Sequence, residues 1–291
     1  MKIMKRFMGA VLSALMMFCC FGLTSCKTPE VKYTFVALVN NSTGFTVSDD
    51  DVSVAIGVKK GSSLTALFNG YLETLSDQAK NDLMIKMYKV SKGEETFTPS
   101  YDPNHDTSSG VLKVAMECGY KPFNWTQNTN ANGALPIHGV PGKYANGYDV
   151  QIAAMLAAAL GFELEIYQAE WGSLVTGVET EVYDAIIAGM SPTAERMEKI
   201  DFTTAYYKSN LVIITREGSQ IASATKLADL DKDGVKIAAQ PGTFHLTALQ
   251  NQTTKLTVVN SYSDFNAMQM ALETGLIDGY VAEEPTAMAF C

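Results

Sequence analysis

The chain has few of the residues that build metal centres or disulfide frameworks. Its 291 residues include three histidines, five cysteines and two tryptophans. No CxxC pair or histidine cluster has the spacing of metal ligands. Basic residues are also few, 22 against 31 acidic ones, which gives a net charge of −9. Nucleic-acid phosphates would repel so acidic a chain. We therefore expect no metal, no cofactor and no nucleic-acid partner.

The first residues have the order of an export signal. A positive start precedes an apolar stretch and a lipobox: Lys2, Lys5 and Arg6; residues 7–23; and Leu23-Thr24-Ser25-Cys26. This is the order of a secretory signal peptide, and the apolar stretch is short for a membrane-spanning helix. We predict a signal peptide at 1–25, a lipid on Cys26 and a tether at 26–32. The lipid would hold the protein at the extracytoplasmic face of the cell membrane.

The rest of the chain alternates between strand-like and helix-like patterns. Its length fits one large domain or two medium ones, and 47% apolar residues support a packed core. From residue 111 onward we expect strands at 111–116, 162–167, 183–188, 211–215, 235–239, 256–259 and 276–281. Helices are expected between them at 148–160, 171–180, 226–231, 244–249 and 263–273, and a further helix begins after Ser191-Pro192-Thr193. This alternation predicts α/β sheets that are mostly parallel.

The two ends of the chain complement each other. After Glu283-Glu284-Pro285 the sequence shows no obvious closing element before Cys291. The front supplies strands at 33–39 and 52–58 and helices at 64–75 and 78–90. Residues 91–110 are rich in Pro, Gly, Ser and Thr, which indicates a linker of flexible or loop character.

An ordered set of short motifs resembles the polar-amino-acid-binding family of extracellular solute-binding proteins of ABC importers. The motifs are Val114–Phe123, Gly147-Tyr148-Asp149-Val150, Trp171-Gly172-Ser173-Leu174, residues 183–191, Thr193-Ala194-Glu195-Arg196 and Asp201-Phe202. The resemblance implies a two-lobed periplasmic-binding-protein-like fold of type II, with the ligand in the cleft between the lobes.

The order of the segments departs from that family. In the family, the Lys-Gly turn and the last two helices follow the second lobe, whereas here the segment 52–90 precedes the first. The chain therefore resembles a circularly permuted member, with 91–110 bridging the original termini. Lobe 1 would be 55–209, and lobe 2 would be 33–54 plus 210–291. The alternative is a tandem protein cut in its middle.

The resemblance also implies the groups that grip the two charges of a free amino acid. Burying either charge unpaired is costly, so a closed cleft needs a fixed cation and a fixed anion. Arg196 matches the arginine that binds the carboxylate, with a planar fork suited to bidentate pairing. Ser191, Gly189, Gly242 and Thr243 would assist. Glu283 would meet the ammonium, although Glu284 leaves the register open by one residue.

Three further residues would shape the side-chain end of the pocket. Tyr120 and Trp171 match aromatic positions that sandwich the ligand side chain, and Glu117 adds a negative charge near it. A cationic ligand such as lysine, arginine or histidine is the first expectation, with a neutral amino acid as the alternative. His245 could line the cleft or cap a helix. Cys118 and Cys291 fall in different predicted lobes, so we expect no disulfide between them.

The predicted function is that of a monomeric lipoprotein that captures a polar amino acid and delivers it to an ABC transporter permease, without catalysis. One rival is an enzyme of the cyclohexadienyl dehydratase kind, in which Glu117 or Glu283 would act as a general acid beside Arg196. A second rival is a receptor that reports ligand binding to a separate signalling partner.

Overall fold

The structure is a computed structural model, and it describes residues 31–37 and 44–291. The predicted signal peptide, the lipidation site Cys26 and most of the tether lie outside the described residues. Within the described ranges, no helix is long and apolar enough to cross a bilayer. Residues 32–291 form one compact unit, and the architecture below is that of this unit.

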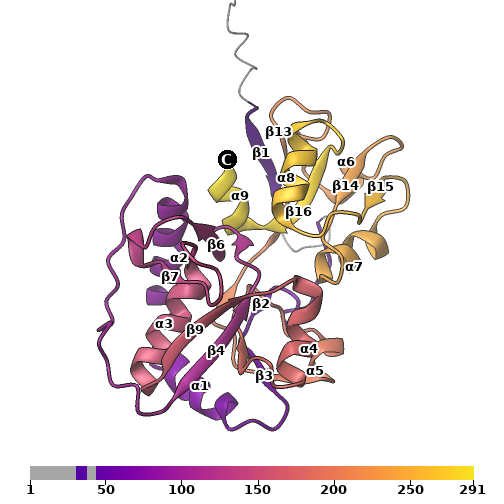
Figure 1. The fold of residues 1–291 in the computed structure, drawn as a ribbon. Helices are drawn as coiled ribbons and strands as arrows, with labels where there is room; N and C mark the ends of the chain where they lie inside the picture. Colours follow the sequence, from indigo (N-terminus) through magenta and orange to yellow (C-terminus); the bar gives the residue numbers. More distant parts are fainter. Residues whose placement is uncertain (1–30, 38–43) are drawn as a thin grey trace, which may run out of the picture. The chain divides into compact units, whose positions relative to one another are not determined.

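Two five-stranded sheets dominate the fold (Figure 1). The first sheet has the order β11-β3-β10-β4-β9: Ile200–Phe202, Gly57–Lys59, Ala185–Ile186, Val111–Met116 and Glu163–Gln168. The second sheet has the order β1-β13-β16-β14-β15: Tyr33–Ala37, Leu211–Arg216, Gly279–Glu283, Lys236–Ala238 and Thr257–Val259. In each sheet two of the four strand pairings are parallel and two are antiparallel, so both sheets are mixed.

The front segment completes both sheets. Strand β1 pairs antiparallel with β13 along its whole length, from Tyr33 opposite Arg216 to Ala37 opposite Val212. Strand β3 lies inside the first sheet, between β10 and β11. Segments far apart in the sequence therefore share one hydrogen-bonded ladder in each sheet.

The chain passes between the two sheets through a small ribbon. Strands β2 (Ser53–Val54) and β12 (Tyr207–Lys208) pair antiparallel, with Tyr207 opposite Val54. Each strand connects an element of one sheet to an element of the other.

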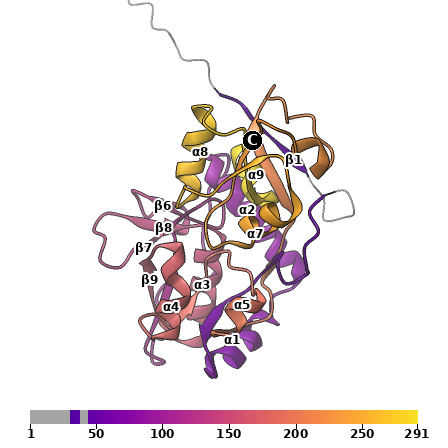
Figure 2. The same cartoon turned by 90° about the vertical axis from the view of Figure 1, so that its right-hand side faces the viewer.

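Helices cover the sheets and join them. Beside the first sheet lie α1 (Leu64–Leu72), α2 (Asp77–Lys92), α3 (Tyr148–Leu160), α4 (Leu174–Glu179) and α5 (Ala194–Met197). With the second sheet lie α6 (Leu227–Leu230), α7 (Phe244–Gln252), α8 (Phe265–Glu273) and α9 (Glu284–Phe290). Helix α9 also packs on α2. In both views α7 faces α4 and α5 across the junction of the two groups (Figures 1 and 2).

The remaining elements form a small meander and two short turns of helix. The meander has the order β5-β6-β8-β7: Gly119–Tyr120, Asn124–Gln127, Tyr144–Asn146 and Leu135–Pro136. The 3-10 turns are η1 (Ala131–Gly133) and η2 (Trp171–Ser173). Helix α8 contacts β5, so the meander lies against the group of helices that belongs to the second sheet.

Several sequence-based boundaries need correction. Helix α2 continues through Ser91 and Lys92 and ends at Gly93, whose φ of 74° is in the left-handed region. The strand expected at 276–281 is β16, and it starts at Gly279 because Ile277 and Leu276 complete the turn after α8. The helix after Ser191-Pro192-Thr193 is four residues long, and Thr193 makes no side-chain cap.

The end of the chain differs most from the expectation. Residues 284–290 form helix α9, with Pro285 in its first turn. Proline is favoured there because the first helical N–H groups have no intrahelical partner. The helix packs on β1, β13 and β16. The chain therefore does have a closing element before Cys291.

Candidate functional site

A pocket lies where the two sheets meet, and it holds about 300 Å³ of free space, part of which is open to solvent. Strand ends and loops of both sheets and their helices supply its walls. The lining residues are Glu117, Tyr120, Trp171, Gly189, Ser191, Arg196, Gln240, Thr243, Phe244, His245, Phe265 and Glu283. Eight of the nine residues predicted to bind the ligand are among them, and so is His245, for which the sequence left open whether it lines the cleft or caps a helix. The ninth, Gly242, faces the same place through its carbonyl oxygen.

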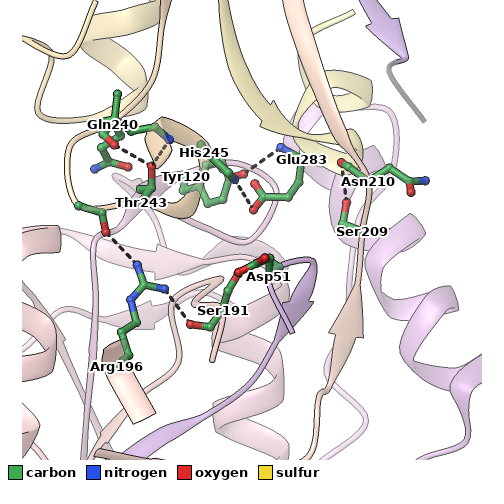
Figure 3. A network of polar contacts seen from close by, with 12 residues as sticks. Asp51, Tyr120, Ser191, Arg196, Ser209, Asn210, Gln240, Thr243, His245 and Glu283 are labelled. Atoms are coloured by element: carbon green, nitrogen blue, oxygen red, sulfur yellow. Dashed lines mark hydrogen bonds and ion pairs between the residues drawn. The ribbon is translucent and has the colours of Figure 1, made fainter. Parts of the chain in front are cut away.

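Arg196 projects from α5 into the junction (Figure 3). Its side chain is buried, and burial lowers the pKa of its guanidinium to about 10, so the group stays charged at neutral pH. Nη1 donates to Ser191 O at 2.7 Å and Nη2 donates to Gly242 O at 2.9 Å. The guanidinium thus lies between the two groups of helices, held by main-chain carbonyls. Because these partners are neutral, the charge is not cancelled.

The loop from Gln240 to Thr243 leads into α7 and faces Arg196. Gly242 has a φ of 73°, a conformation that side chains with a Cβ rarely adopt. This conformation lets its carbonyl accept from both Arg196 and Trp171 Nε1, the latter at 3.1 Å. Thr243 caps α7, because its hydroxyl accepts from Leu246 N at 3.4 Å and donates to Gln240 O at 2.7 Å. The loop is therefore held rigidly at the pocket wall.

The aromatic residues line one side of the pocket. Tyr120 stacks with Phe265 at a centroid distance of 4.0 Å and with Phe123 at 5.1 Å. The Tyr120 hydroxyl accepts from Glu283 N at 3.3 Å. Trp171 lies over the Arg196 guanidinium, with its ring centroid 5.1 Å from Cζ. The rings of Tyr120 and Trp171 therefore contact protein groups and also line the pocket.

The residue predicted to meet the ligand ammonium is Glu283, and its contacts fix its position at the pocket. Glu283 is the last residue of β16 and lines the pocket, and its Oε1 lies 2.9 Å from His245 Nε2. Burial raises the pKa of Glu283 to about 8. Glu284 turns away and accepts from Asn210 Nδ2 at 3.0 Å. Of the two glutamates between which the sequence left the register open, Glu283 is therefore the one at the pocket.

A second carboxyl group lies at another wall. Glu117 Oε1 accepts from Gln240 Nε2 at 2.7 Å. Burial raises the pKa of Glu117 to about 7, and the charges of Asp264 and Glu170 add to the effect. A positive group placed beside Glu117 would relieve this unfavourable negative potential.

Ser191 and Gly189 lie on the floor formed by the first sheet's loops. The Ser191 hydroxyl donates to Asp51 O at 2.7 Å, which leaves its lone pairs as acceptors. Gly189 has a φ of 62°, and a Cβ there would approach the Tyr120 ring to 3.4 Å. Both residues thus keep backbone and small polar groups close to the pocket.

The sequence-based reasoning missed Gln240, Phe244 and Phe265. Phe265 follows the helix cap Asp264, and no periodicity of its own segment marks it as part of a site. It reaches the pocket only because α8 docks on β5. Gln240 directly precedes the Pro-Gly-Thr loop, and that position was the available signal. Among the described residues, no cluster of His, Cys, Asp and Glu could hold a metal ion.

Comparison with known proteins gives a consistent set of relatives. Residues 112–264 match the family model of bacterial extracellular solute-binding proteins, family 3. The arginine-binding extracellular protein ArtP of Bacillus subtilis is 31% identical over 126 residues, which are 43% of this chain and 44% of that protein. A probable histidine-binding protein of Campylobacter jejuni is 28% identical over 201 residues, 68% of this chain and 69% of that protein.

The fold has solved counterparts. The holo structure of ArgBP from T. maritima matches with a TM-score of 0.53 and 28% identity, covering 63% of this chain and 73% of that one. The predicted two-lobed fold of type II is confirmed by this match. The chain spans less than half the length of the B. subtilis relative, 44%.

Proposed function

We propose that this chain, which belongs to family 3 of the bacterial extracellular solute-binding proteins, captures one free amino acid in its pocket and delivers it to an ABC transporter permease. One observation carries the proposal. A buried guanidinium, Arg196, and a buried carboxyl group, Glu283, line the same pocket from different groups of elements. A zwitterion can pair with the guanidinium and with the carboxyl group, once that group is ionised, at the same time.

The roles follow from the chemistry of each group. The ligand carboxylate would take the place of the Gly242 carbonyl on Arg196, with the Thr243 and Ser191 region beside it. The ligand ammonium would face Glu283. The new contact with Arg196 would join two charged groups, whereas the contact it replaces joins the charged guanidinium to a neutral carbonyl oxygen.

A cationic side chain is the ligand feature that fits best. Glu117 is half-buried at the pocket wall, its pKa is raised to about 7, and Asp264 and Glu170 add negative potential. A guanidinium or ammonium there would lower that pKa and would itself be stabilised. The names of the arginine- and histidine-binding relatives agree with this choice.

The remaining parts of the proposal concern the whole molecule. We place lobe 1 at 55–209 and lobe 2 at 33–54 with 210–291, and we interpret the chain as a circularly permuted monomer. The pairing of β1 with β13 and of β3 with β10 and β11 supports this interpretation.

Ligand binding would close the lobes about the β2–β12 ribbon, as hinge proteins do. The lipid on Cys26 would hold the protein at the membrane.

A ligand screen tests the proposal. Thermal melting across the twenty amino acids should show an upward shift for arginine, lysine or histidine, because a ligand that binds only the folded state stabilises it. Arg196→Ala should abolish that shift while keeping a cooperative transition. The proposal is lost if no amino acid shifts the transition.

Incubation with prephenate or arogenate addresses the enzyme rival, and formation of an aromatic product would favour that rival.

A further inference from the structure

We infer that Glu283 and His245 form an uncharged, proton-holding pair in the empty pocket, and that an entering ammonium group displaces one proton from it. The inference rests on the proposed function, because it describes how the same pocket takes up the α-ammonium of its ligand. It adds a linkage between ligand capture and external pH.

The geometry isolates the pair from water and from other polar groups. Glu283 Oε1 and His245 Nε2 are 2.9 Å apart, and the two side chains are only 6% and 4% exposed. Glu283 Oε2 and His245 Nδ1 are both buried and make no hydrogen bond with the described residues. A carboxylate in such a place would have only the contact with His245 and a weak interaction with its own backbone N–H to offset the loss of its hydration. Burial therefore favours the form without net charge.

The groups around the pair do not supply a compensating cation at contact distance. Of the basic groups in the described residues, His245 alone lies within ion-pair distance of Glu283. Tyr120 on β5 contacts the backbone N–H of Glu283, and Phe265 on α8 packs edge-on to the imidazole. Glu117, after β4, is the other acid that lines the pocket, and Arg196, on α5, is the charged base.

The electrostatic effects on the two partners agree with each other. Burial lowers the pKa of His245, and the positive charge of Arg196 lowers it further. Burial raises the pKa of Glu283. Both shifts favour a neutral imidazole beside a protonated carboxyl group over an imidazolium–carboxylate ion pair. The empty pair thus holds two exchangeable protons, one on the ring and one on the carboxyl group.

An ammonium group changes this balance. A fixed positive charge beside Glu283 stabilises the carboxylate strongly in a pocket of low dielectric. The carboxyl proton leaves to solvent, while the imidazole keeps its proton and donates from Nε2 to Oε1. Oε2 is then available as an acceptor for the ammonium, which keeps its three protons. No covalent bond of the ligand is formed or broken, and one proton appears in solution for each ligand bound.

Calorimetric titration with arginine, lysine and histidine, in two buffers of different ionisation enthalpy, counts that proton. For the best ligand of the three, we expect Glu283 to release close to one proton at pH 6.5 and less as the pH rises past 8. A cationic side chain that lowers the pKa of Glu117 from about 7 adds a further fraction of a proton. The Glu283 proton alone should increase the affinity about tenfold per pH unit between roughly pH 5.5 and 7.5. Glu283→Gln should bind more weakly and release about one proton fewer than the unaltered protein at pH 6.5. Glu284→Gln, which alters the neighbouring carboxyl group that bonds to Asn210, should release the proton as the unaltered protein does.

Nitrogen NMR of the imidazole rings tests the pair without any ligand. The chain has three histidines, and His245→Gln identifies the resonances of His245. We expect a neutral ring at pH 5.5 to 8 in the empty protein. An imidazolium signal at pH 7, or ligand binding without proton release at pH 6.5, would overturn the inference. Because the NMR measurement needs no ligand, its failure is distinct from a failure of amino-acid binding.

Discussion

Arg196 Nη2 donates to the carbonyl oxygen of Gly242 at 2.9 Å, and this bond joins α5 to the loop that precedes α7 (Figure 3). Trp171 Nε1 donates to the same oxygen at 3.1 Å. Groups that are proposed to hold a ligand carboxylate therefore hold each other in the structure. A carboxylate is a stronger acceptor than a carbonyl, so a ligand can displace Gly242 O from the guanidinium with a net gain.

Replacing Arg196 by lysine should weaken amino-acid binding by about ten- to a hundredfold. Lysine keeps the positive charge but cannot form two parallel hydrogen bonds, and a lost hydrogen bond to a charged group costs about 1.5–3 kcal/mol. Calorimetric titration measures the effect. Lys199→Ala is the matched control, because that side chain is exposed and makes only a 4.0 Å surface contact with Glu195. An affinity for Arg196→Lys within threefold of the original would contradict the proposed role.

Two substitutions at Tyr120 should separate its ring from its hydroxyl. Tyr120→Phe keeps the stacking with Phe265 but leaves the buried N–H of Glu283 without its acceptor, at a cost of about 1 kcal/mol. Tyr120→Ala also removes the ring and should cost roughly 3–5 kcal/mol. Urea unfolding of the empty protein gives both values. Equal losses for the two variants would show that the stacking does not stabilise the closed pocket.

Clear periodicity explains what the sequence predicts well. The expected strand at 111–116 and helix at 148–160 have the bounds of β4 and α3. In α3, apolar residues line the helix, and Gly161, with a φ of 75°, ends it. Such local signals do not depend on the rest of the fold, which is why they were sufficient there.

Tertiary contacts explain what the sequence does not predict. Helix α9 was missed because Pro285 and two glutamates are typical of a loop, whereas packing on β1, β13 and β16 stabilises a helix. Phe265 reaches the pocket through the docking of α8. The choice between Glu283 and Glu284 likewise depends on where β16 ends, because Glu283 is the last residue of the strand and Glu284 is the first residue of α9.

The stability of the empty protein should fall as the pH rises from about 5 to 8. The pKa of Glu283 is raised from 4.5 to about 8 in the folded protein. A buried carboxyl group of this kind stabilises the fold below its unfolded pKa and loses that contribution as the pH rises through the folded one. Because of this group, the free energy of unfolding falls by at most about 1.4 kcal/mol per pH unit. Opening of the pocket rehydrates the carboxylate and makes the fall smaller.

The substitution Glu283→Gln should make the melting temperature of the empty protein less dependent on pH across this interval. Glu284→Gln should leave the dependence as it is, since that carboxyl group already bonds to Asn210. Thermal melting at pH 5, 6.5 and 8 provides the comparison. If the melting temperatures of the unaltered protein and of Glu283→Gln changed equally with pH, Glu283 would ionise in the folded protein at little cost in free energy. That result would contradict the prediction.

A chain in the family's segment order should fold and bind as this one does. Residues 111–291 would come first, followed by a short flexible joint and residues 33–92. Helix α9 packs on β1, and the chain end marked C lies beside that strand in Figure 1, so a short joint can connect Cys291 to Tyr33. Closely spaced ends make such rearrangements inexpensive. The reordered protein should melt within a few degrees of the original and bind the same amino acid.

The matched control for the reordered chain is the fragment 111–291 alone. It lacks β3, which lies between β10 and β11, and β1, which covers one edge of the second sheet. Removing an interior strand leaves backbone hydrogen-bonding groups unpaired in the core, which costs more than a domain of this size can spare. The fragment should show no cooperative melting. If it instead melted cooperatively and bound ligand like the whole chain, the front segment would not be part of the binding unit, and the permuted arrangement would be wrong.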